Sequence, residues 1–180
     1  MKATGIVRRI GDLGRIVIPK EIRRTLRIRE GDPLEIFTDR EGKVILKKYS
    51  PIGELGTLAG IYADSLSKTL GCTVCITDTD QVIAAAGNGK KELQEMLLSA
   101  ELAEVFQERK TVLKKSSDAE FVAITKDRSE YSEEIISVIL SEGDIAGGVI
   151  FLQKNEKKHF GEMEKKLASG VADLLGRQLS

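Results

Sequence analysis

The first 50 residues alternate between β-branched apolar and polar positions, in short runs separated by turn residues. This alternation predicts strands. Pro19 suits the first position of a helix, and Ile22 and Leu26 then share one face at a spacing of four, which predicts a helix to residue 26. Gly11 and Gly14 supply turn chemistry between the first two strands, and residues 39–42 form a hairpin loop between the last two. We expect strands at residues 4–10, 15–18, 34–38 and 43–48.

This head (residues 1–50) is too small to be a secure monomer. Domains of this size bury only about 60% of their chain surface, and they commonly need a metal, disulfides or a partner chain. The predicted strands at 34–37 and 44–46 also carry apolar residues on both faces, as in a sheet that is covered on both sides. We therefore expect an obligate dimer.

Two long amphipathic helices bracket the remaining body (residues 51–180). Apolar residues recur every three or four positions over residues 52–70 and again over residues 160–178, which predicts one helix in each range. Gly53, Gly56 and Gly60 weaken the first helix, so packing must hold it, and they would let a partner helix approach closely.

Between these helices the pattern shortens to strand-like runs. The residues at 91–109 read as helical, with a break near Ser99. The strands at 135–140 and 145–153 are expected to form a hairpin across residues 141–144. The body is therefore predicted to be a central antiparallel sheet flanked by terminal helices, in an α+β chain. The predicted strands are 72–77, 82–86, 121–125, 135–140 and 145–153.

Charge divides the chain at the same place. Lys and Arg number 13 against 7 Asp and Glu in residues 1–50, a net charge of +6, and the remainder carries −6. Nine cations fall within the first 30 residues, and seven of them are arginines, which suit bidentate contacts to phosphate and guanine. A solvated surface with arginines paired to Glu21, Glu30 and Asp32 is the alternative. Dimerisation would double the basic surface and favours a polyanion as the partner.

Several other functions are disfavoured. No uncharged stretch exceeds nine residues, so no membrane span is expected, and the N-terminal residues lack the apolar core of a secretory signal. Two cysteines give no disulfide framework and indicate a reducing, cytoplasmic location. We expect no cofactor and no bound metal.

Several residues of types that often take part in catalysis or metal binding have structural interpretations here. Cys72 and Cys75 lack further ligands for zinc and would point to opposite faces of a strand, as buried, inert thiols. His159 is the only histidine, and it lies in a charged run. The loop at residues 87–90 lacks the rest of a phosphate-binding signature, and anion binding at the N-terminus of the following helix is the alternative for it. Asp78, Asp80 and Asp118 are interpreted as turn residues. We therefore expect a protein that is not an enzyme.

The head carries a long and specific motif. Met1-Lys-Ala-Thr-Gly-Ile-Val-Arg-Arg-Ile10, followed by Leu13-Gly-Arg-Ile-Val-Ile-Pro-Lys-Glu-Ile-Arg-Arg-Thr-Leu26, resembles the AbrB-like transition-state regulators of spore-forming bacteria. The resemblance implies a swapped-hairpin β-barrel in which two chains interleave. Gly11 departs from the family pattern, because an acidic residue is expected at this turn position. The implied DNA-contacting residues are Arg8, Arg15, Arg23 and Arg24, with Lys2, Arg9, Lys20 and Arg27 as weaker candidates for flanking phosphate contacts.

The same resemblance implies a GAF-type sensor fold for the body. The expected division is a DNA-binding and dimerisation domain at 1–50, a short connection at 51–55, and a GAF-like domain at 56–180 that oligomerises and takes an unidentified small-molecule effector as a candidate ligand. The leading hypothesis is a cytoplasmic, nucleoid-associated, sequence-selective regulator that binds double-stranded DNA and controls sporulation genes. Pairing of the helices at 52–70 and 160–178 would make a dimer of dimers, a homotetramer.

Two alternatives come from other classes. An antitoxin-like module would use the body to bind a protein, although such modules usually continue after the head in a short disordered tail. A nucleotide-hydrolysing enzyme built on the body would need metal ligands and a general base, which the sequence does not offer.

Overall fold

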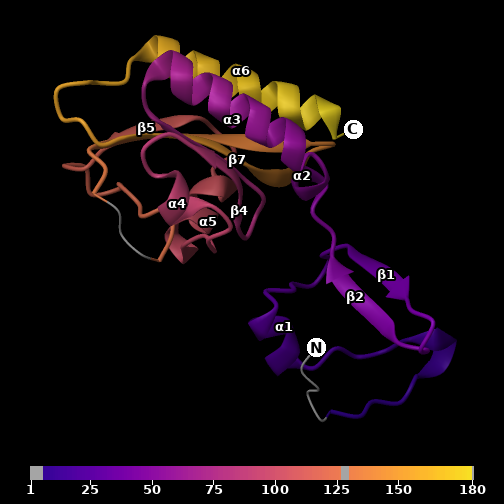
Figure 1. Cartoon of the computed structure of the whole chain (residues 1–180). Coiled ribbons are helices and arrows are strands. Elements are labelled where there is room, and N and C mark those ends of the chain that lie inside the picture. Colours follow the sequence, from indigo (N-terminus) through magenta and orange to yellow (C-terminus); the bar gives the residue numbers. More distant parts are fainter. Residues whose placement is uncertain (1–5, 127–129, 180) are drawn as a thin grey trace. The chain divides into compact units, whose positions relative to one another are not determined.

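The computed structural model describes residues 6–126 and 130–179. The chain divides into two compact units, residues 1–49 and residues 50–180. The first unit contains a short 3-10 helix η1 (Asp12–Gly14), helix α1 (Lys20–Thr25) and the antiparallel strands β1 (Leu34–Thr38) and β2 (Val44–Lys48) (Figure 1). Asp39 closes the β1–β2 turn because its carboxylate Oδ1 accepts hydrogen bonds from the backbone N–H groups of Glu41 (2.9 Å) and Lys43 (2.8 Å).

The second unit is built on one five-stranded antiparallel sheet with the order β4-β3-β7-β6-β5. Its strands are β3 (Thr73–Thr77), β4 (Val82–Ala86), β5 (Val112–Lys115), β6 (Glu133–Ser141) and β7 (Asp144–Gln153). Its helices are α2 (Pro51–Glu54), α3 (Gly56–Leu70), α4 (Lys90–Leu93), α5 (Ala100–Gln107) and α6 (Glu162–Gln178). The α+β class and the antiparallel sheet flanked by helices are confirmed.

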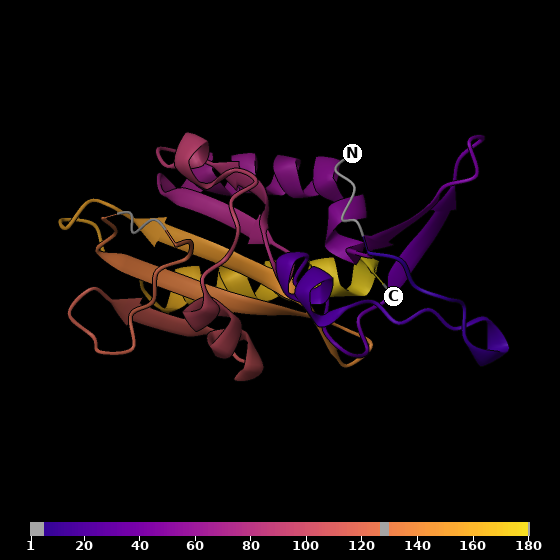
Figure 2. The same cartoon turned by 90° about the horizontal axis from the view of Figure 1, so that it is seen from below.

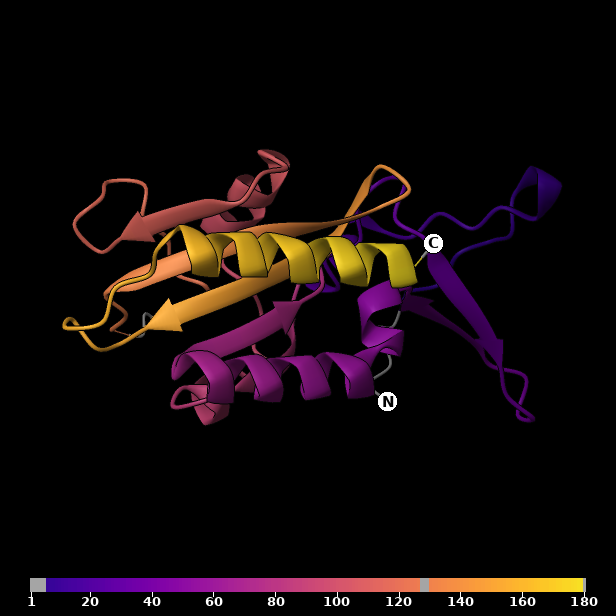
Figure 3. The ribbon, with the colours of Figure 1, turned by 90° about the horizontal axis from the view of Figure 1, so that it is seen from above.

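The sheet separates two hydrophobic cores. Helices α3 and α6 both lie across one face, over which Ala59, Ala63 and Ala172 pack against the strands (Figures 1 and 3). Helix α5 covers the opposite face with Leu102 and Phe106, as the view from below shows (Figure 2). Strands β3, β6 and β7 are thereby buried on both sides. Small residues let the first layer pack closely, since a Cβ at Gly176 of α6 would lie 2.0 Å from the carbonyl oxygen of Leu140.

Four local predictions for the body need correction. The helix expected at 52–70 is interrupted at Leu55, so it forms α2 and α3. The helical run at 91–109 is two short helices, between which Leu97 and Leu98 form isolated bridges. Ser99 does end this interruption, because its Oγ caps α5 by accepting the N–H of Leu102 at 3.0 Å. Residues 121–125 are not a strand, whereas β5 was missed.

Residues 6–10 and 15–18, the described parts of the two strands expected at the start of the first unit, do not form strands. A strand needs a neighbour for its hydrogen bonds, and among the described residues these segments pair with none. Among the described residues of this unit, Pro19 is the only buried one. Its exposed large apolar residues are Ile6, Val7, Ile10, Leu13, Ile16, Val17, Leu26, Ile36, Phe37, Val44, Ile45 and Leu46.

We expect residues 1–53 alone to form a folded dimer, because an apolar surface of this extent needs a second chain to cover it. Analytical ultracentrifugation combined with circular dichroism measures this. The full chain at the same concentrations should form an even-numbered oligomer. A folded monomeric fragment would contradict a core shared between chains.

Glu133 should stabilise the second unit in a pH-dependent way. Its buried carboxylate accepts the N–H of Phe160 at 2.7 Å and contacts His159 Nδ1 at 2.6 Å, and so fastens the segment before α6 to the sheet. Burial raises the pKa of Glu133, but these hydrogen bonds outweigh it and leave the pKa below its ordinary value. A lowered pKa means that the stabilisation is present above the ordinary pKa and is lost as pH falls through the lowered one.

Glu133→Gln should therefore reduce the free energy of unfolding by about 2 kcal/mol at neutral pH, and the difference from the native protein should shrink in acid. Urea titrations at several pH values measure both. A difference between the two proteins that does not change with pH would contradict this account.

Candidate nucleic-acid interface

The predicted DNA-contacting arginines lie on three successive segments of the first unit. Arg8 and Arg9 are exposed on the extended segment that precedes η1. Arg15 follows η1, and its carbonyl accepts the N–H of Gly11 at 2.7 Å, which closes a loop around η1. Within this loop Leu13 and Gly14 have positive φ angles of 62° and 73°. The arginines before and after η1 are apart in sequence, but the Gly11–Arg15 hydrogen bond brings the backbone on the two sides of η1 together.

Helix α1 carries the next group of cations. It begins directly after the buried Pro19, whose carbonyl accepts the N–H of Arg23 at 3.0 Å. Lys20 and Arg24 are exposed, and Arg23 is half-buried. Arg27 follows the helix with a φ of 52° and is also half-buried. Lys2 lies outside the described residues.

The acidic residues of the unit do not neutralise these arginines. Within residues 6–126 and 130–179, Arg8, Arg9, Arg15, Arg23 and Arg24 form no ion pair with a carboxylate. Asp32 is engaged elsewhere, by Lys48 Nζ at 3.0 Å and by the N–H of Arg29 at 2.7 Å. The alternative in which these arginines pair with Glu21, Glu30 and Asp32 is therefore not what this chain shows. Their guanidinium groups remain available for an external anion.

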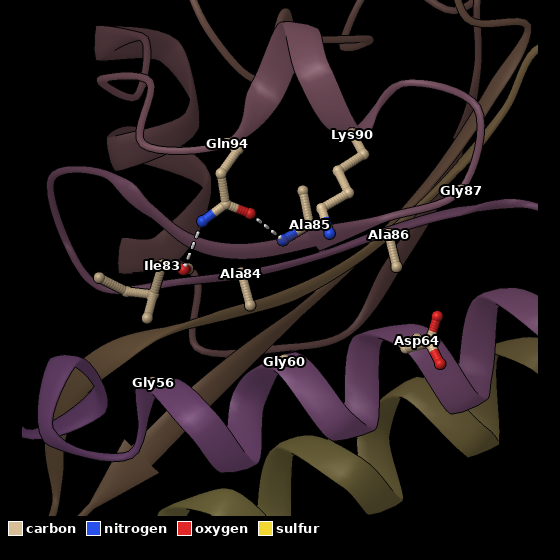
Figure 4. A pocket seen from close by; sticks show the side chains of 10 residues that line it. All are labelled: Gly56, Gly60, Asp64, Ile83, Ala84, Ala85, Ala86, Gly87, Lys90 and Gln94. Atoms are coloured by element: carbon tan, nitrogen blue, oxygen red, sulfur yellow. Dashed lines mark hydrogen bonds between the residues drawn. The ribbon is translucent and has the colours of Figure 1, made fainter.

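The second unit holds a small pocket that the sequence did not indicate. It has a volume of about 190 Å³ and lies between α3, the outer edge of β4 and α4 (Figure 4). Gly56 and Gly60 form its floor, and a Cβ at Gly56 would lie 3.9 Å from Ile83. Two of the three glycines expected to admit a partner helix thus line a pocket beside β4. Because ligand pockets commonly exceed about 300 Å³, this one is small for a typical effector.

Gln94 closes the strand edge beside this pocket. Its side-chain Oε1 accepts the N–H of Ala85 at 3.0 Å, and its Nε2 donates to the carbonyl of Ile83 at 2.9 Å (Figure 4). One carboxamide therefore satisfies two outward-pointing backbone groups of β4. Lys90 and Asp64 supply the only charges among the residues that line the pocket, from α4 and α3 respectively.

The remaining candidate residues take structural roles. Cys72 and Cys75 are free and buried, and they belong to the two different cores, as predicted for opposite faces of a strand. Burial raises the pKa of Cys72 to about 11 and that of Cys75 to about 12, so both stay protonated thiols at neutral pH. Asp78 and Asp118 cap turns through backbone N–H groups. Within the described residues no group of three or more potential ligands could hold a metal ion.

Comparison with known proteins identifies the family. A family model described as "Stage V sporulation protein T C-terminal, transcription factor" matches residues 54–180. Stage V sporulation protein T of Bacillus subtilis is 50% identical over 99% of both chains. The chain belongs to the stage V sporulation protein T family.

Other similarities cover parts of this stage V sporulation protein T family member. The transition state regulatory protein AbrB of Bacillus subtilis is 43% identical over 95 residues, which cover 52% of this chain and 98% of that protein. Residues 7–54 match a model described as "Antidote-toxin recognition MazE, bacterial antitoxin". The GAF domain of PixJ from Thermosynechococcus elongatus covers 73% of this chain and 88% of its own, with a TM-score of 0.56 at 14% identity. An AbrB-like head and a GAF-like fold in the body are thus confirmed.

Proposed function

We propose that the protein is a sequence-selective transcriptional regulator of sporulation genes that binds double-stranded DNA through its first unit. The observation that carries this proposal is a set of five arginines, Arg8, Arg9, Arg15, Arg23 and Arg24, that form no ion pair with a carboxylate among the described residues, in a head with a net charge of +6. Membership of a family described as transcription factors supports it. The protein would act in the cytoplasm, at the nucleoid, and without catalysis.

The basic residues of the head would make two kinds of contact with DNA. Arg8, Arg15, Arg23 and Arg24 are assigned to phosphates and base edges, where a planar guanidinium can donate two parallel hydrogen bonds. Lys2, Arg9, Lys20 and Arg27 are assigned to flanking phosphates. Phosphate contacts fix the position of the protein, and base contacts together with local DNA deformability supply the selectivity.

Association of chains would complete the DNA-binding surface. The uncovered apolar residues of the first unit support a homodimer with an interleaved barrel. Exposed apolar residues on the outer faces of α3 and α6 support a second interface and a homotetramer; they are Ile61, Met163, Leu167 and Leu174, which are 57%, 79%, 36% and 44% exposed. Two heads on one DNA molecule would raise the affinity through effective concentration.

The GAF-like second unit is proposed to oligomerise and to receive a small-molecule effector. Its fold supports this role. The antitoxin-like alternative draws support from the match over residues 7–54, but the family match over residues 54–180 favours transcription. Within the described residues, no helix has the length and apolar character needed to cross a membrane.

Hydrogen bonds of Ser50 hold the start of the second unit in place. Ser50 Oγ donates to Asp78 Oδ2 at 2.8 Å and accepts the N–H of Gly53 at 3.1 Å, so it caps α2 and ties it to the β3–β4 turn. Asp78 is itself held, because its Oδ1 accepts the N–H groups of Asp80 and Gln81 at 2.7 Å each. We propose that this attachment lets the second unit influence two-site binding by the heads.

Replacing Arg8, Arg15, Arg23 and Arg24 with alanine should abolish tight DNA binding and leave the free energy of unfolding within about 1 kcal/mol, because the arginines contribute no core packing. Each lost phosphate contact should reduce the slope of log K against log salt by roughly 0.9. Fluorescence anisotropy over a salt series measures the slope. Arg40→Ala, an exposed arginine of the β1–β2 turn, is the matched control, and salt-insensitive tight binding by the quadruple variant would refute the assignment.

Insertion of about ten Gly and Ser residues after Ser50 should preserve binding to a one-site duplex but weaken binding to a two-site duplex, by about ten- to a hundredfold. A flexible linker lowers the effective concentration of the second head. Any effector that shifts DNA affinity should lose that influence in the insertion variant. Titrations with one-site and two-site duplexes measure both effects, and an unchanged two-site affinity would argue that the second unit only oligomerises.

A further inference from the structure

A loop segment of the second unit, residues 116–125, lies over the core on the α5 side of the sheet. Ile124 is buried in that core, and Phe121 and Val122 pack against it. The segment is not part of the sheet, and its bridge between Thr125 and Leu98 lies outside the named strands. It therefore covers apolar side chains without the continuous hydrogen bonding that would hold a strand in place.

The N–H of Ser116 donates to the carbonyl of Ser132 at 2.8 Å at the start of this segment, and residues 120–124 are held from two sides. On the α5 side, Ser99 Oγ donates to the carbonyl of Ala123 at 2.5 Å, and the N–H of Ser99 donates to the carbonyl of Ile124 at 3.0 Å. On the sheet side, Lys114 Nζ donates to the carbonyl of Glu120 at 2.9 Å, and Glu134 Oε1 accepts the N–H of Val122 at 3.1 Å.

The sheet-side fastening uses two charged residues that face each other. Lys114 of β5 and Glu134 of β6 are register partners, and they are 6% and 0% exposed. Their side chains hydrogen-bond to backbone atoms of Glu120 and Val122, which are two residues apart in the segment. Burying such a pair is costly unless every polar atom is satisfied. Here one is not, because Glu134 Oε2 is buried and has no hydrogen-bond partner within residues 6–126 and 130–179.

Little else around Glu134 compensates its charge. Lys114 is the cation of β5 on this face, and the segment itself adds Glu120, whose Oε2 lies 3.8 Å from Lys114 Nζ. The register partner on β7 is Leu152, and α5 faces this core with apolar side chains. Tyr131 and Cys75 are the other titratable groups in the core.

We propose that Lys114 and Glu134 form a charge-sensitive latch that holds residues 116–125 over the second core, and that ionisation of Glu134 loosens it. When Glu134 is neutral, its remaining hydrogen bond to Val122 keeps the segment closed without a buried charge. When it is ionised, opening the segment brings water to the carboxylate and to its unpartnered oxygen.

The acid–base properties of the latch agree with this geometry. Burial raises the pKa of Glu134 to about 7, against the lowering influence of the Val122 N–H and of Lys114. A carboxyl group whose pKa is raised in the closed state favours closure at low pH and opening as pH rises from the ordinary value toward the raised one. The transition is therefore expected near neutral pH.

Amide hydrogen exchange of the full-length protein tests the latch. After correction for the intrinsic exchange rate, the opening equilibrium constant at Val122 should rise more than tenfold from about pH 5.5 to about pH 8. In Glu134→Gln, which keeps an acceptor for Val122, this constant should be nearly independent of pH. Ser99→Ala is the matched control, because removing a neutral fastening should raise opening by the same factor at both pH values.

Other outcomes would overturn the proposal. A native protein whose opening constant at Val122 does not change with pH would exclude a charge-sensitive latch. An equal rise in Glu134→Gln would assign the pH response to another group. A rise shared by all amides of the second unit would mean global unfolding and no local latch. If Glu134→Gln does not fold, the native protein and Ser99→Ala still distinguish a pH-dependent local opening from pH-independent opening and from global unfolding.

Discussion

The uncovered apolar surface of the first unit is the constraint on which the rest of the molecule depends. A chain segment in which only Pro19 is buried, among the residues described, has no interior of its own. Hydrophobic burial is the main favourable term in folding, and we propose that a second chain supplies it here. Folding of the head and association would then be one process. The spacing between arginines on neighbouring heads would consequently be a property of the assembly.

The second unit buries its apolar residues within one chain. Its sheet is covered by α3 and α6 on one face and by α5 on the other, so the central strands carry apolar residues at successive positions. Two adjacent buried glutamates lie near one end of β6. Glu133 serves one face and Glu134 the other, and each holds a connecting segment through a backbone N–H. The strand thus fastens the covering segments of both cores.

The sequence allowed correct prediction of elements whose periodicity is strong, and failed where pairing depends on partners distant in sequence. The long helices, the β1–β2 hairpin and the opposite facing of Cys72 and Cys75 follow from local spacing alone. Residues 121–125 look like a strand because they are apolar, but neighbours on β5 and α5 hold them as a covering loop. Residues 6–10 and 15–18 have strand composition without a partner in the chain.

The candidate site shows a similar division. The basic residues of the head could be found from composition and motif, because their chemistry does not depend on burial, and Arg8, Arg15 and Arg24 are exposed. Glu134 could not be singled out, since nothing in its local sequence tells which of two adjacent glutamates is buried without a partner for one oxygen. The role of Gln94 could not be predicted either, because the fold of α4 is what brings Gln94 next to its partners on β4.

Gln94 has a consequence for solubility. Strand β4 ends the sheet, and an open strand edge is a template on which a further chain can add, which leads to aggregation. The carboxamide of Gln94 has the same donor and acceptor pair as a peptide group, and it occupies the outward N–H of Ala85 and carbonyl of Ile83 that an incoming strand would need. If the protein assembles through other surfaces, as we propose, Gln94 keeps this edge from competing with them.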